Sequence, residues 1–409
     1  MRKRTSSSSS SSRRWRTTKL AMSVLVLCVG SLLLTQDRFS RIMAAAAVRQ
    51  PPPPPPKIAF LFIARNRLPL DLVWDAFFKG DSDGNRFSIY VHSRPGFVLN
   101  GVTTRSAFFH NRHVNKSIQV DWGESSMIEA ERILIRSALE DSLNERFLFL
   151  SDSCIPLYSF SYIYDYIMST KATFLDSFAD TKEGRYNPKM HPIVPINNWR
   201  KGSQWAVLIR KHAEIMVNDD IVFPEFQKYC RRKSLPEFWR DRPVPAEGWK
   251  EHNCIPDEHY VQTLLAQKGL EGEITRRSLT HSAWDLSSSR NRERRGWHPS
   301  TYKLSDATPM LIKAIKDIDN INYETEYRRE WCTSRGKPSK CFLFARKFTR
   351  AAALRLLNMS VSDRDMPNRI SIDRIASVSA DTANYAFCTC SELMNQSTIA
   401  GGSKEGLLD

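Results

Sequence analysis

Residues 254–260 (CIPDEHY) place two acids and a histidine together at the start of an apolar helical pattern. Pro256 suits a first helical turn, and the dipole of a helix N-terminus stabilises acids such as Asp257 and Glu258. That structural role accounts for acids at this position in many proteins. The functional interpretation is that Glu258 acts as a general base and removes a proton from a hydroxyl group. Packing or capping explains His259 better than catalysis does.

A second candidate segment, CFLFARKF at residues 341–348, is an apolar run that ends in two cations. A diphosphate leaving group needs positive charge as it departs, and arginine binds phosphate through two parallel hydrogen bonds. Arg346 and Lys347 could supply this charge, together with Arg335 from the loop before the run. The alternative interpretation is a solvated basic edge that binds no ligand.

The chain offers few acidic ligands for a metal ion. Asp152 is the only acid in FLFLSDSCIPLY (147–158), although a metal that binds a nucleotide sugar is usually held by an Asp-x-Asp pair. Such pairs occur only away from the predicted buried strands, at Asp81/Asp83, Asp317/Asp319 and Asp363/Asp365. No CxxC pair occurs either, so the sequence predicts no metal site.

Three segments combine aromatic residues with polar neighbours: NWRKGSQW (198–205), HSAWD (281–285) and GWHPSTY (296–302). Aromatic faces stack on sugar rings, while polar neighbours form hydrogen bonds with sugar hydroxyls. Trp205, Trp284 and Tyr302 are therefore candidate acceptor-binding residues. Aromatics of this kind serve equally often as core anchors, and both interpretations stay open.

Apolar strands and helices alternate along the first half of the chain and must position these segments. We expect strands over 57–64, 87–93, 146–151 and 172–178, and helices over 70–80, 126–141, 161–169 and 257–269. A capping box formed by Ser126 and Glu129 should open the second helix. This alternation indicates an α/β fold with a largely parallel sheet. Ligands bind such sheets at the carboxyl ends of strands, which directs attention to residues 65–67, 92–94 and 151–154.

Residues 20–35 form an uncharged apolar run behind a basic tail, and the first acid is Asp37. This pattern predicts an uncleaved anchor with a cytosolic N-terminus. The run is short for a full bilayer, but short spans suit thinner early-secretory membranes. A cleaved signal peptide and a chloroplast transit peptide are the alternatives. Six prolines at 51–56 should form a stiff spacer.

The predicted organisation has five parts. They are a cytosolic basic tail (1–19), a transmembrane signal anchor (20–36), a stem (37–56), a lumenal domain (57–357) and a poorly ordered C-terminal tail (358–409). A hydrophobic content of 41% with 11% aromatic residues is ample for a buried core. The formal net charge of +16 suggests a polyanionic partner or a phosphate-bearing ligand, and a lumenal location argues against nucleic acid.

The chain contains eight cysteines. An oxidising lumen allows disulfides, and we expect Cys332 and Cys341 to pair across a short loop that contains Gly and Pro. Asn115, Asn358 and Asn395 each begin an N-glycosylation motif, which agrees with a lumenal placement.

Several long strings, in order, resemble the plant branch of the core-2/I-branching β-1,6-N-acetylglucosaminyltransferase-like family, which includes the brittle-culm-type Golgi glycosyltransferases. They are VDWGESSMIEAERILI, RFLFLSDSCIPLYSFSYIYDYI, WRKGSQWAVLIRKHAE, CIPDEHYVQTLLA, RRSLTHSAWD, HPSTYK and CFLFARKF. The resemblance spans about residues 57–357. It implies a lumenal domain of the GT-A (Rossmann-like) type, a UDP-sugar donor, inversion at the anomeric carbon and basic residues in place of a divalent metal.

The resemblance also assigns roles to residues of the two main candidate segments. The family's catalytic glutamate lies in a Pro-Asp-Glu segment, which matches Glu258 and makes it the expected base. Its diphosphate-binding lysine lies in a Phe-Ala-x-Lys-Phe segment, which matches Lys347. The partner arginine falls in a less clear region, where we expect Arg335, with Arg329 as the alternative.

Ala64, Arg65 and His92 match regions that hold the uridine of the donor. Animal relatives commonly have an acid before the Phe-Pro or Tyr-Pro that follows the third strand. This chain has Cys154-Ile155-Pro156 there, with Asp152 two residues earlier. N-acetylglucosamine therefore cannot be assumed as the donor sugar.

The sequence thus predicts a type II Golgi glycosyltransferase. Glu258 would deprotonate a glycan hydroxyl, which attacks the donor sugar as UDP leaves toward Lys347 and an arginine. The expected acceptors are wall glycans or arabinogalactan-proteins. The rival hypothesis is a non-catalytic carbohydrate-binding or scaffolding protein that retains the fold.

Overall fold

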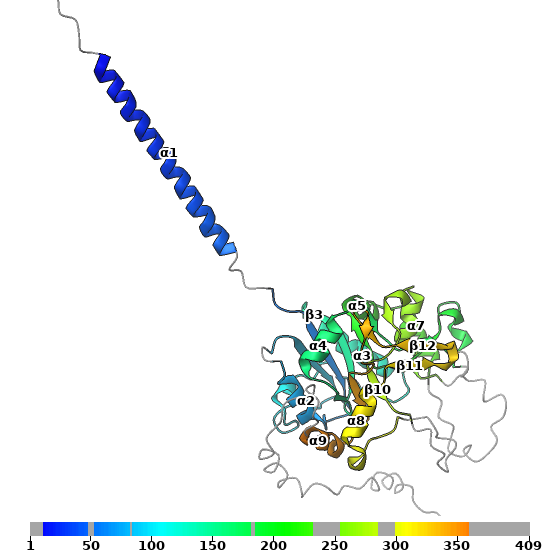
Figure 1. Ribbon diagram of the computed structural model, residues 1–409. Helices are drawn as coiled ribbons and strands as arrows, with labels where there is room; N and C mark the ends of the chain where they lie inside the picture. The colour runs from blue at the N-terminus through cyan, green and yellow to red at the C-terminus, as the bar shows by residue number, and fades with distance from the viewer. Residues whose placement is uncertain are drawn as a thin grey trace, which may run out of the picture. The chain divides into compact units, whose positions relative to one another are not determined.

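The computed structural model describes residues 11–47, 53–81, 84–180, 185–231, 254–284 and 299–359. The chain divides into two compact units, Met1–Pro54 and Pro55–Asp409. In the first unit, helix α1 (Ser11–Ala47, blue in Figure 1) contains the stretch Lys19–Arg41, which is long and apolar enough to cross a membrane. The predicted anchor lies inside this stretch. A signal sequence shares this length, composition and position, so that alternative stays open.

The second unit is built on a six-stranded sheet with the order β2-β1-β3-β8-β5-β9. Its strands are β1 (Lys57–Ile63), β2 (Phe87–His92), β3 (Asn144–Ser151), β5 (Thr173–Phe174), β8 (Val207–Ile209) and β9 (Ile274–Thr275). Strand β1 is parallel to β2 and β3, and β5 is parallel to β9, whereas β8 runs antiparallel to both neighbours. The predicted α/β class is confirmed, with one reversed strand inside a largely parallel sheet.

Both faces of this sheet are buried, which explains why its first strands are continuously apolar. Successive side chains of β1 point to opposite faces. Phe60 and Phe62 pack on Trp74 at ring-centroid distances of 6.1 and 5.0 Å, while Ala59 and Leu61 belong to the core of the other face. The first core includes α2 (Asp71–Phe78), α4 (Phe160–Met168), α8 (Pro309–Lys316) and α9 (Arg350–Asn358). The second includes α3 (Ser126–Leu139), α5 (Arg210–Val217), α6 (Val222–Tyr229) and α7 (Tyr260–Gln267).

A smaller sheet brings together segments that the sequence singled out separately. Its order is β10 (Thr280–Ser282), β15 (Phe344–Arg346) and β4 (Ile155–Pro156). Strand β15 runs parallel to β10 and antiparallel to β4, so that Ala345 lies opposite Ile155. The cationic end of CFLFARKF therefore lies beside the segment that follows β3.

Short ladders and turns complete the described part of the second unit. The ladders are β6 (Phe178–Ala179) with β7 (Arg200–Lys201), β11 (Asn320–Tyr323) with β12 (Arg328–Trp331), and β13 (Thr333–Ser334) with β14 (Lys337–Pro338). The 3-10 turns are η1 (Ala107–Phe109), η2 (Pro188–Met190), η3 (Ile196–Asn198), η6 (Pro256–Glu258), η7 (Glu271–Glu273), η9 (Leu304–Asp306) and η10 (Glu324–Glu326).

Two expected elements differ from the structure. The strand expected over 172–178 is interrupted between β5 and β6, because the carboxylate of Asp176 accepts hydrogen bonds from Ser203 N (3.0 Å) and Tyr323 Oη (2.6 Å). The capping box is wrong: the N-cap of α3 is Ser125, and its side chain makes no capping hydrogen bond. Ser126 Oγ instead accepts a hydrogen bond from the Asp121 backbone N–H at 3.0 Å.

Two disulfides join described cysteines, the expected Cys332–Cys341 and also Cys230–Cys254. The second joins the end of α6 to the residues just before η6. Cys154 is a buried free thiol, and burial raises its pKa to about 12. The expected tail lies outside the described residues from position 360 onward.

Candidate active site

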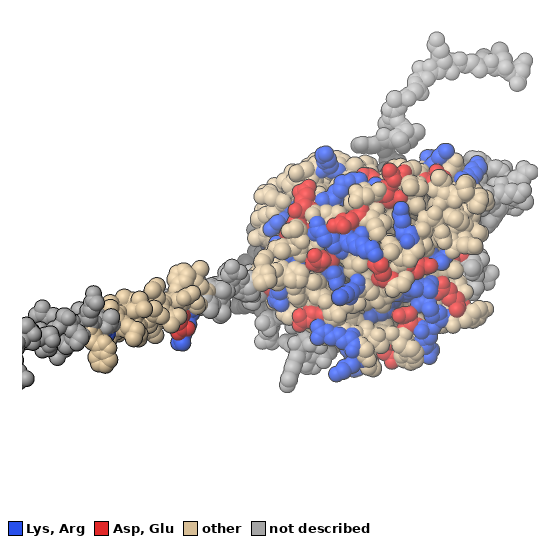
Figure 2. All heavy atoms as spheres, turned by 90° about the horizontal axis from the view of Figure 1, so that it is seen from above, with Lys and Arg blue, Asp and Glu red and all other residues tan. Residues whose placement is uncertain are grey.

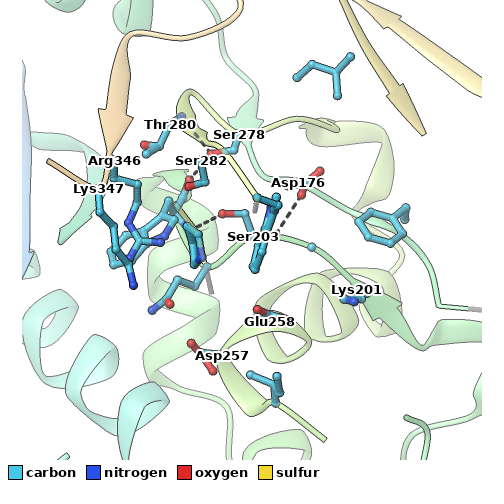
Figure 3. Close-up of a pocket in the computed structure, with 18 of the residues that line it drawn as sticks. Asp176, Lys201, Ser203, Asp257, Glu258, Ser278, Thr280, Ser282, Arg346 and Lys347 are labelled. Atoms are coloured by element: carbon cyan, nitrogen blue, oxygen red, sulfur yellow. Dashed lines mark hydrogen bonds between the residues drawn. The ribbon is translucent and has the colours of Figure 1, made fainter. Parts of the chain in front are cut away.

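A cavity of about 570 Å³ in the second unit lies against the small sheet, and its lining includes Thr280 and Ser282 of β10. It is lined by Glu258 from η6, by Arg346 and Lys347 from the end of β15, and by Trp205 and Trp284. In the view of Figure 3, Arg346 and Lys347 lie at one side, Lys201 lies at the other, and Glu258 lies between them. The fold thus joins the two segments to which the sequence assigned chemistry.

Glu258 is held in place by its backbone and by one ion pair. Its carbonyl accepts a hydrogen bond from Gly202 N at 2.9 Å, and its Oε2 accepts one from Arg185 Nη1 at 3.3 Å. The side chain of Glu258 is about one quarter exposed. Because Arg185 orients the carboxylate from one side, the carboxylate can act as a base toward a hydroxyl in the cavity.

Residue 202 must be glycine for its N–H to reach the Glu258 carbonyl, because there is no room for a side chain at this position. A Cβ atom at this position would lie 1.8 Å from the carbonyl oxygen of Asp176. The close crossing of residues 176 and 202 keeps the Gly202 N–H against the Glu258 carbonyl. Glycine is thus required here by close backbone approach.

A second carboxyl lies beneath the expected base. Asp257 is buried, and burial together with the neighbouring Glu258 charge raises its pKa to about 7. Glu131 of α3 is also buried; burial and then the charge of Asp257 raise its pKa, although Gln204 donates a hydrogen bond to it at 3.3 Å. Both carboxyl groups therefore hold their protons to a higher pH than ordinary carboxyl groups do.

His259 serves the core, as the sequence favoured. Its Nδ1 lies 2.8 Å from the carbonyl oxygen of Ile255, and its Nε2 lies 3.3 Å from Asp180 Oδ2. The ring stacks on Trp199 at 4.6 Å. Both nitrogens are occupied, so His259 fixes the turn and does not face the cavity.

Arg346 and Lys347 concentrate positive charge at the cavity wall. The Arg346 guanidinium lies 4.5 Å from the centre of the Trp205 ring, and among the described residues its buried Nε has no hydrogen-bond partner. Burial lowers the pKa of Arg346 to about 10. Burial, followed by the charges of Arg346 and Arg65, lowers the pKa of Lys347. Two cations that repel each other and lose hydration form a site for an anion.

The strand-end residues expected to hold uridine lie outside the lining of this cavity. Ala64 is buried, and the Arg65 side chain is 94% exposed with its Nε 4.0 Å from Asp152 Oδ2. Burial raises the pKa of Asp152 against the opposing charges of Arg65, Arg346 and Lys347. Asp152 therefore connects the end of β1 to the cationic wall electrostatically.

His92 is buried at the end of β2, and burial lowers its pKa to about 4. Its Nε2 accepts a hydrogen bond from the Ile118 N–H at 3.1 Å. The imidazole is consequently neutral at physiological pH and supports the loop after β2.

Arg335 lies in a different place from the one expected. It is an exposed residue of the turn between β13 and β14 and lines a second cavity, not the one that contains Lys347. The alternative, Arg329, lies on β12 with its guanidinium 5.5 Å from the Trp331 ring and also lies outside the lining. The cation beside Lys347 is its sequence neighbour Arg346.

The candidate acceptor aromatics have different positions. Trp284 is 46% exposed at the rim of the cavity. Trp205 is nearly buried under Arg346, so its ring positions a cation instead of presenting a free face. Tyr302 does not line the cavity; its N–H donates to the Lys347 carbonyl at 2.8 Å and its ring packs on Phe348. The acceptor role remains a proposal for Trp284 alone.

The three asparagines predicted as N-glycosylation sites remain to be placed. Asn115 and Asn358 are exposed, and Asn395 lies beyond residue 359, outside the described residues.

The sequence analysis did not predict Arg185, Lys201 and Trp122, which also line the cavity. Arg185 lies in none of the strings singled out above, whereas Trp122 lies in VDWGESSMIEAERILI, and Lys201 and Gly202 lie in NWRKGSQW.

Within the described ranges, no cluster of three or more His, Cys, Asp or Glu side chains could hold a metal ion. Figure 2 shows one face of the molecule, on which Lys and Arg are interspersed with Asp and Glu. On that face acidic side chains separate the positive charges, whereas Arg346 and Lys347 line the cavity as neighbours in the sequence.

Comparisons with known proteins show which sequences and structures this chain is similar to. The family model of the core-2/I-branching enzyme matches residues 58–316. The rice (Oryza sativa subsp. japonica) protein named glycosyltransferase BC10 is 75% identical over 307 residues, which cover 75% of this chain and 77% of that protein. Among solved structures, galactosyltransferase LgtC with donor and acceptor sugar analogues is 12% identical. The match covers 53% of this chain and 72% of the LgtC chain, with a TM-score of 0.27. An active-site mutant of LgtC is 9% identical. The match covers 79% of this chain and 96% of the mutant chain, with a TM-score of 0.31.

Proposed function

The chain belongs to the core-2/I-branching enzyme family of glycosyltransferases, and from this premise we propose that it transfers a sugar from a UDP-sugar to a glycan hydroxyl with inversion. One observation carries the proposal: Glu258 and the Arg346–Lys347 pair line the same cavity although they are far apart in sequence. The cavity thus offers a base at one position and a site for a leaving diphosphate at another.

The chemistry follows from these positions. The Glu258 carboxylate takes the proton of the acceptor hydroxyl, and the acceptor oxygen forms a bond to the anomeric carbon of the donor. The bond from that carbon to the diphosphate breaks, and UDP leaves with the electron pair toward Arg346 and Lys347. A single displacement of this kind inverts the anomeric configuration. Arg185 orients the base through its contact with Oε2.

We propose that the reaction is independent of metal ions. The support is the cationic pair itself, because the two side chains can supply the charge neutralisation that a divalent ion would otherwise give. Asp152, with Arg65, would place the nucleoside end of the donor near the carboxyl ends of β1 and β3.

The proposed location is the Golgi membrane, with the catalytic unit in the lumen. Helix α1 supports it as a candidate single-pass anchor behind a basic tail. The donor sugar is N-acetylglucosamine-like in the proposal, and the acceptors are wall glycans or arabinogalactan-proteins. The rival hypothesis, a non-catalytic carbohydrate-binding protein, does not explain why a carboxylate placed as a base and a partly buried cationic pair line one cavity.

The decisive experiment compares the full-length protein with Glu258→Gln on a panel of UDP-sugars and glycan acceptors. We expect the variant to lose about 10²- to 10⁴-fold in kcat, as for removal of a general base. UDP affinity should stay unchanged, because the cations are intact. Undiminished transfer by Glu258→Gln would exclude this base.

Two controls make the result specific. Glu214→Gln removes another carboxylate, one that pairs with Arg210 on α5 and does not line the cavity, and it should leave transfer unchanged. UDP should raise the melting temperature equally with and without EDTA; protection that disappears on chelation contradicts the metal-independent mechanism. Product NMR that shows a retained anomeric configuration would contradict single displacement.

A further inference from the structure

A second cavity, of about 300 Å³, has a lining that no part of the proposed reaction uses. It is rich in hydroxyl groups, contains charges of both signs and has a tryptophan at its rim. The residues that matter here are Thr275, Arg277, Glu330, Trp331, Ser334 and Arg335. The volume lies at the lower end of the range for small-ligand sites, about 300–1,000 Å³.

The lining suits a sugar ring. Trp331 is 57% exposed, so its indole presents an apolar face to solvent beside polar neighbours. Ser334 Oγ lies 3.1 Å from Ser169 Oγ, and both hydroxyls line the cavity. Hydroxyls both donate and accept hydrogen bonds, which matches the alternating donors and acceptors of a sugar.

Arg277 fixes this wall from behind. The residue is fully buried; Nη1 donates to the Cys341 carbonyl at 2.8 Å and Nη2 donates to Tyr166 Oη at 2.7 Å. These two hydrogen bonds tie the wall to the core, so the cavity is held in one shape without a ligand.

The second cavity shares its wall with the first. Arg277 lines the second cavity and the next residue, Ser278, lines the first. The β11–β12 hairpin repeats this relation, because Ile321 lines the first cavity and its register partner Glu330 lines the second. Paired Cα atoms on neighbouring strands are only about 5 Å apart. A chain molecule bound in one cavity can therefore reach the other by crossing one hairpin.

We propose that the second cavity is a glycan-binding subsite that holds an acceptor sugar remote from the reacting hydroxyl. The proposal rests on the function proposed above. The lining offers a polyhydroxyl ligand both donors and acceptors: Arg328 Nη1 donates to Glu330 Oε2 at 2.7 Å, and Arg335 lines the same cavity, away from the cations that line the first. Arg335 thus contributes to acceptor recognition and not to donor binding.

The test uses the full-length protein and β-linked galacto-oligosaccharides of increasing length. Trp331→Ala should raise KM about 10-fold for the longest oligosaccharides, should leave KM for the shortest unchanged, and should not change kcat. Tyr327→Ala is the matched control, because it truncates an exposed aromatic on the same hairpin that lines neither cavity. Equal KM values for Trp331→Ala and the wild type at every length would overturn the subsite.

A binding measurement separates failure of the subsite from failure of the proposed function. Calorimetric titration of the same oligosaccharides into Glu258→Gln needs no turnover, and adding Trp331→Ala or Arg335→Ala should weaken binding of the long members by a similar factor. Such a loss supports the subsite; if the wild type also transfers no sugar to any acceptor of the panel, the proposed enzyme is contradicted while the subsite stands. Length-independent binding, or UDP binding that Arg335→Ala abolishes, overturns the subsite even if transfer is observed.

Discussion

At the scale of single residues, Arg346 shows how burial prepares a site for an anion. Its guanidinium is fixed on the Trp205 ring and faces Lys347 without a direct carboxylate partner among the described residues. Asp152, Asp257 and Glu258 act on it only as nearby charges. A bound diphosphate would provide the missing hydrogen bonds at little cost in side-chain ordering.

Arg346→Ala should therefore weaken UDP binding by about 10- to 100-fold, since hydrogen bonds to charged groups contribute about 1.5–3 kcal/mol. Arg346→Lys keeps the charge but loses the planar stacking and should give an intermediate value. Calorimetric titration with UDP measures both. Lys268→Ala removes an exposed cation that lines neither cavity and is the control. Wild-type affinity in Arg346→Ala would exclude this residue as a phosphate ligand.

Asp257 gives a prediction about pH. Its pKa is about 7 in the folded protein against an ordinary value of 3.8, so the folded state binds the extra proton between these values. The contribution of Asp257 to stability is thus full below about pH 4 and is lost as pH rises through about 7. The charged groups that face it are Glu131 from α3, Glu258 beside it and Arg346 from β15.

Asp257→Asn stays neutral at every pH and should remove this dependence. Relative to the wild type, the variant should gain stability as pH rises from about 4 to about 7, by at most about 4 kcal/mol, because one pKa unit corresponds to about 1.4 kcal/mol. Thermal unfolding at a series of pH values measures the difference. A stability difference that does not change with pH would show that Asp257 titrates normally.

The sequence predicted the site residue by residue with mixed success. Two contiguous motifs carry these residues, CIPDEHY for Glu258 and CFLFARKF for Arg346 and Lys347, and the three side chains do line one cavity. Arg335 was misplaced because the chain reverses at a tight turn between β13 and β14, which directs it to another cavity. Spacing along the chain cannot show on which side of a short hairpin a side chain lies.

At the scale of elements, the turn that carries Glu258 depends on the crossing at Gly202. Any Cβ at this position would overlap the Asp176 carbonyl, so the β6–β7 crossing must separate to admit it. The separation would also break the hydrogen bond from Gly202 N to the Glu258 carbonyl. The base would then move although it is chemically intact.

Gly202→Ala should lower kcat by about 10²-fold or more, as expected for a base displaced by about 1 Å, and should also lower the melting temperature. Gly272→Ala is a matched control, because no atom lies within 4 Å of its added Cβ. Steady-state kinetics and thermal unfolding of both variants provide the comparison. Full activity in Gly202→Ala would show that the crossing does not position Glu258.

The sequence was most informative where an element is long and buried on both faces. Strands β1, β2 and β3 lie within two residues of their expected bounds, because continuous apolar runs mark them. Strand β8 is three residues long and reversed, and β5 is two residues long, so neither leaves a periodic pattern. Their place in the sheet is set by tertiary contacts such as the Asp176 hydrogen bonds.

At the scale of the whole molecule, the basic tail, helix α1, the proline spacer and the catalytic unit form a series consistent with a type II membrane enzyme. The orientation has a chemical consequence, because only lumenal asparagines are glycosylated. Asn115 is exposed in the catalytic unit and begins the motif Asn-Lys-Ser. The membrane topology can therefore be read from one modification.

In microsomes, endoglycosidase treatment should reduce the apparent mass of the wild type, and Asn115→Gln should remove one of the steps of that shift. Protease added outside sealed microsomes should remove a tag at the N-terminus but leave the catalytic unit intact, because the positive-inside rule holds the basic tail in the cytosol. The same N-terminal tag distinguishes an uncleaved anchor from a cleaved signal peptide. If it leaves the protein while the catalytic unit stays glycosylated, α1 is removed and is not an anchor; if the catalytic unit is digested without glycans, the orientation is reversed.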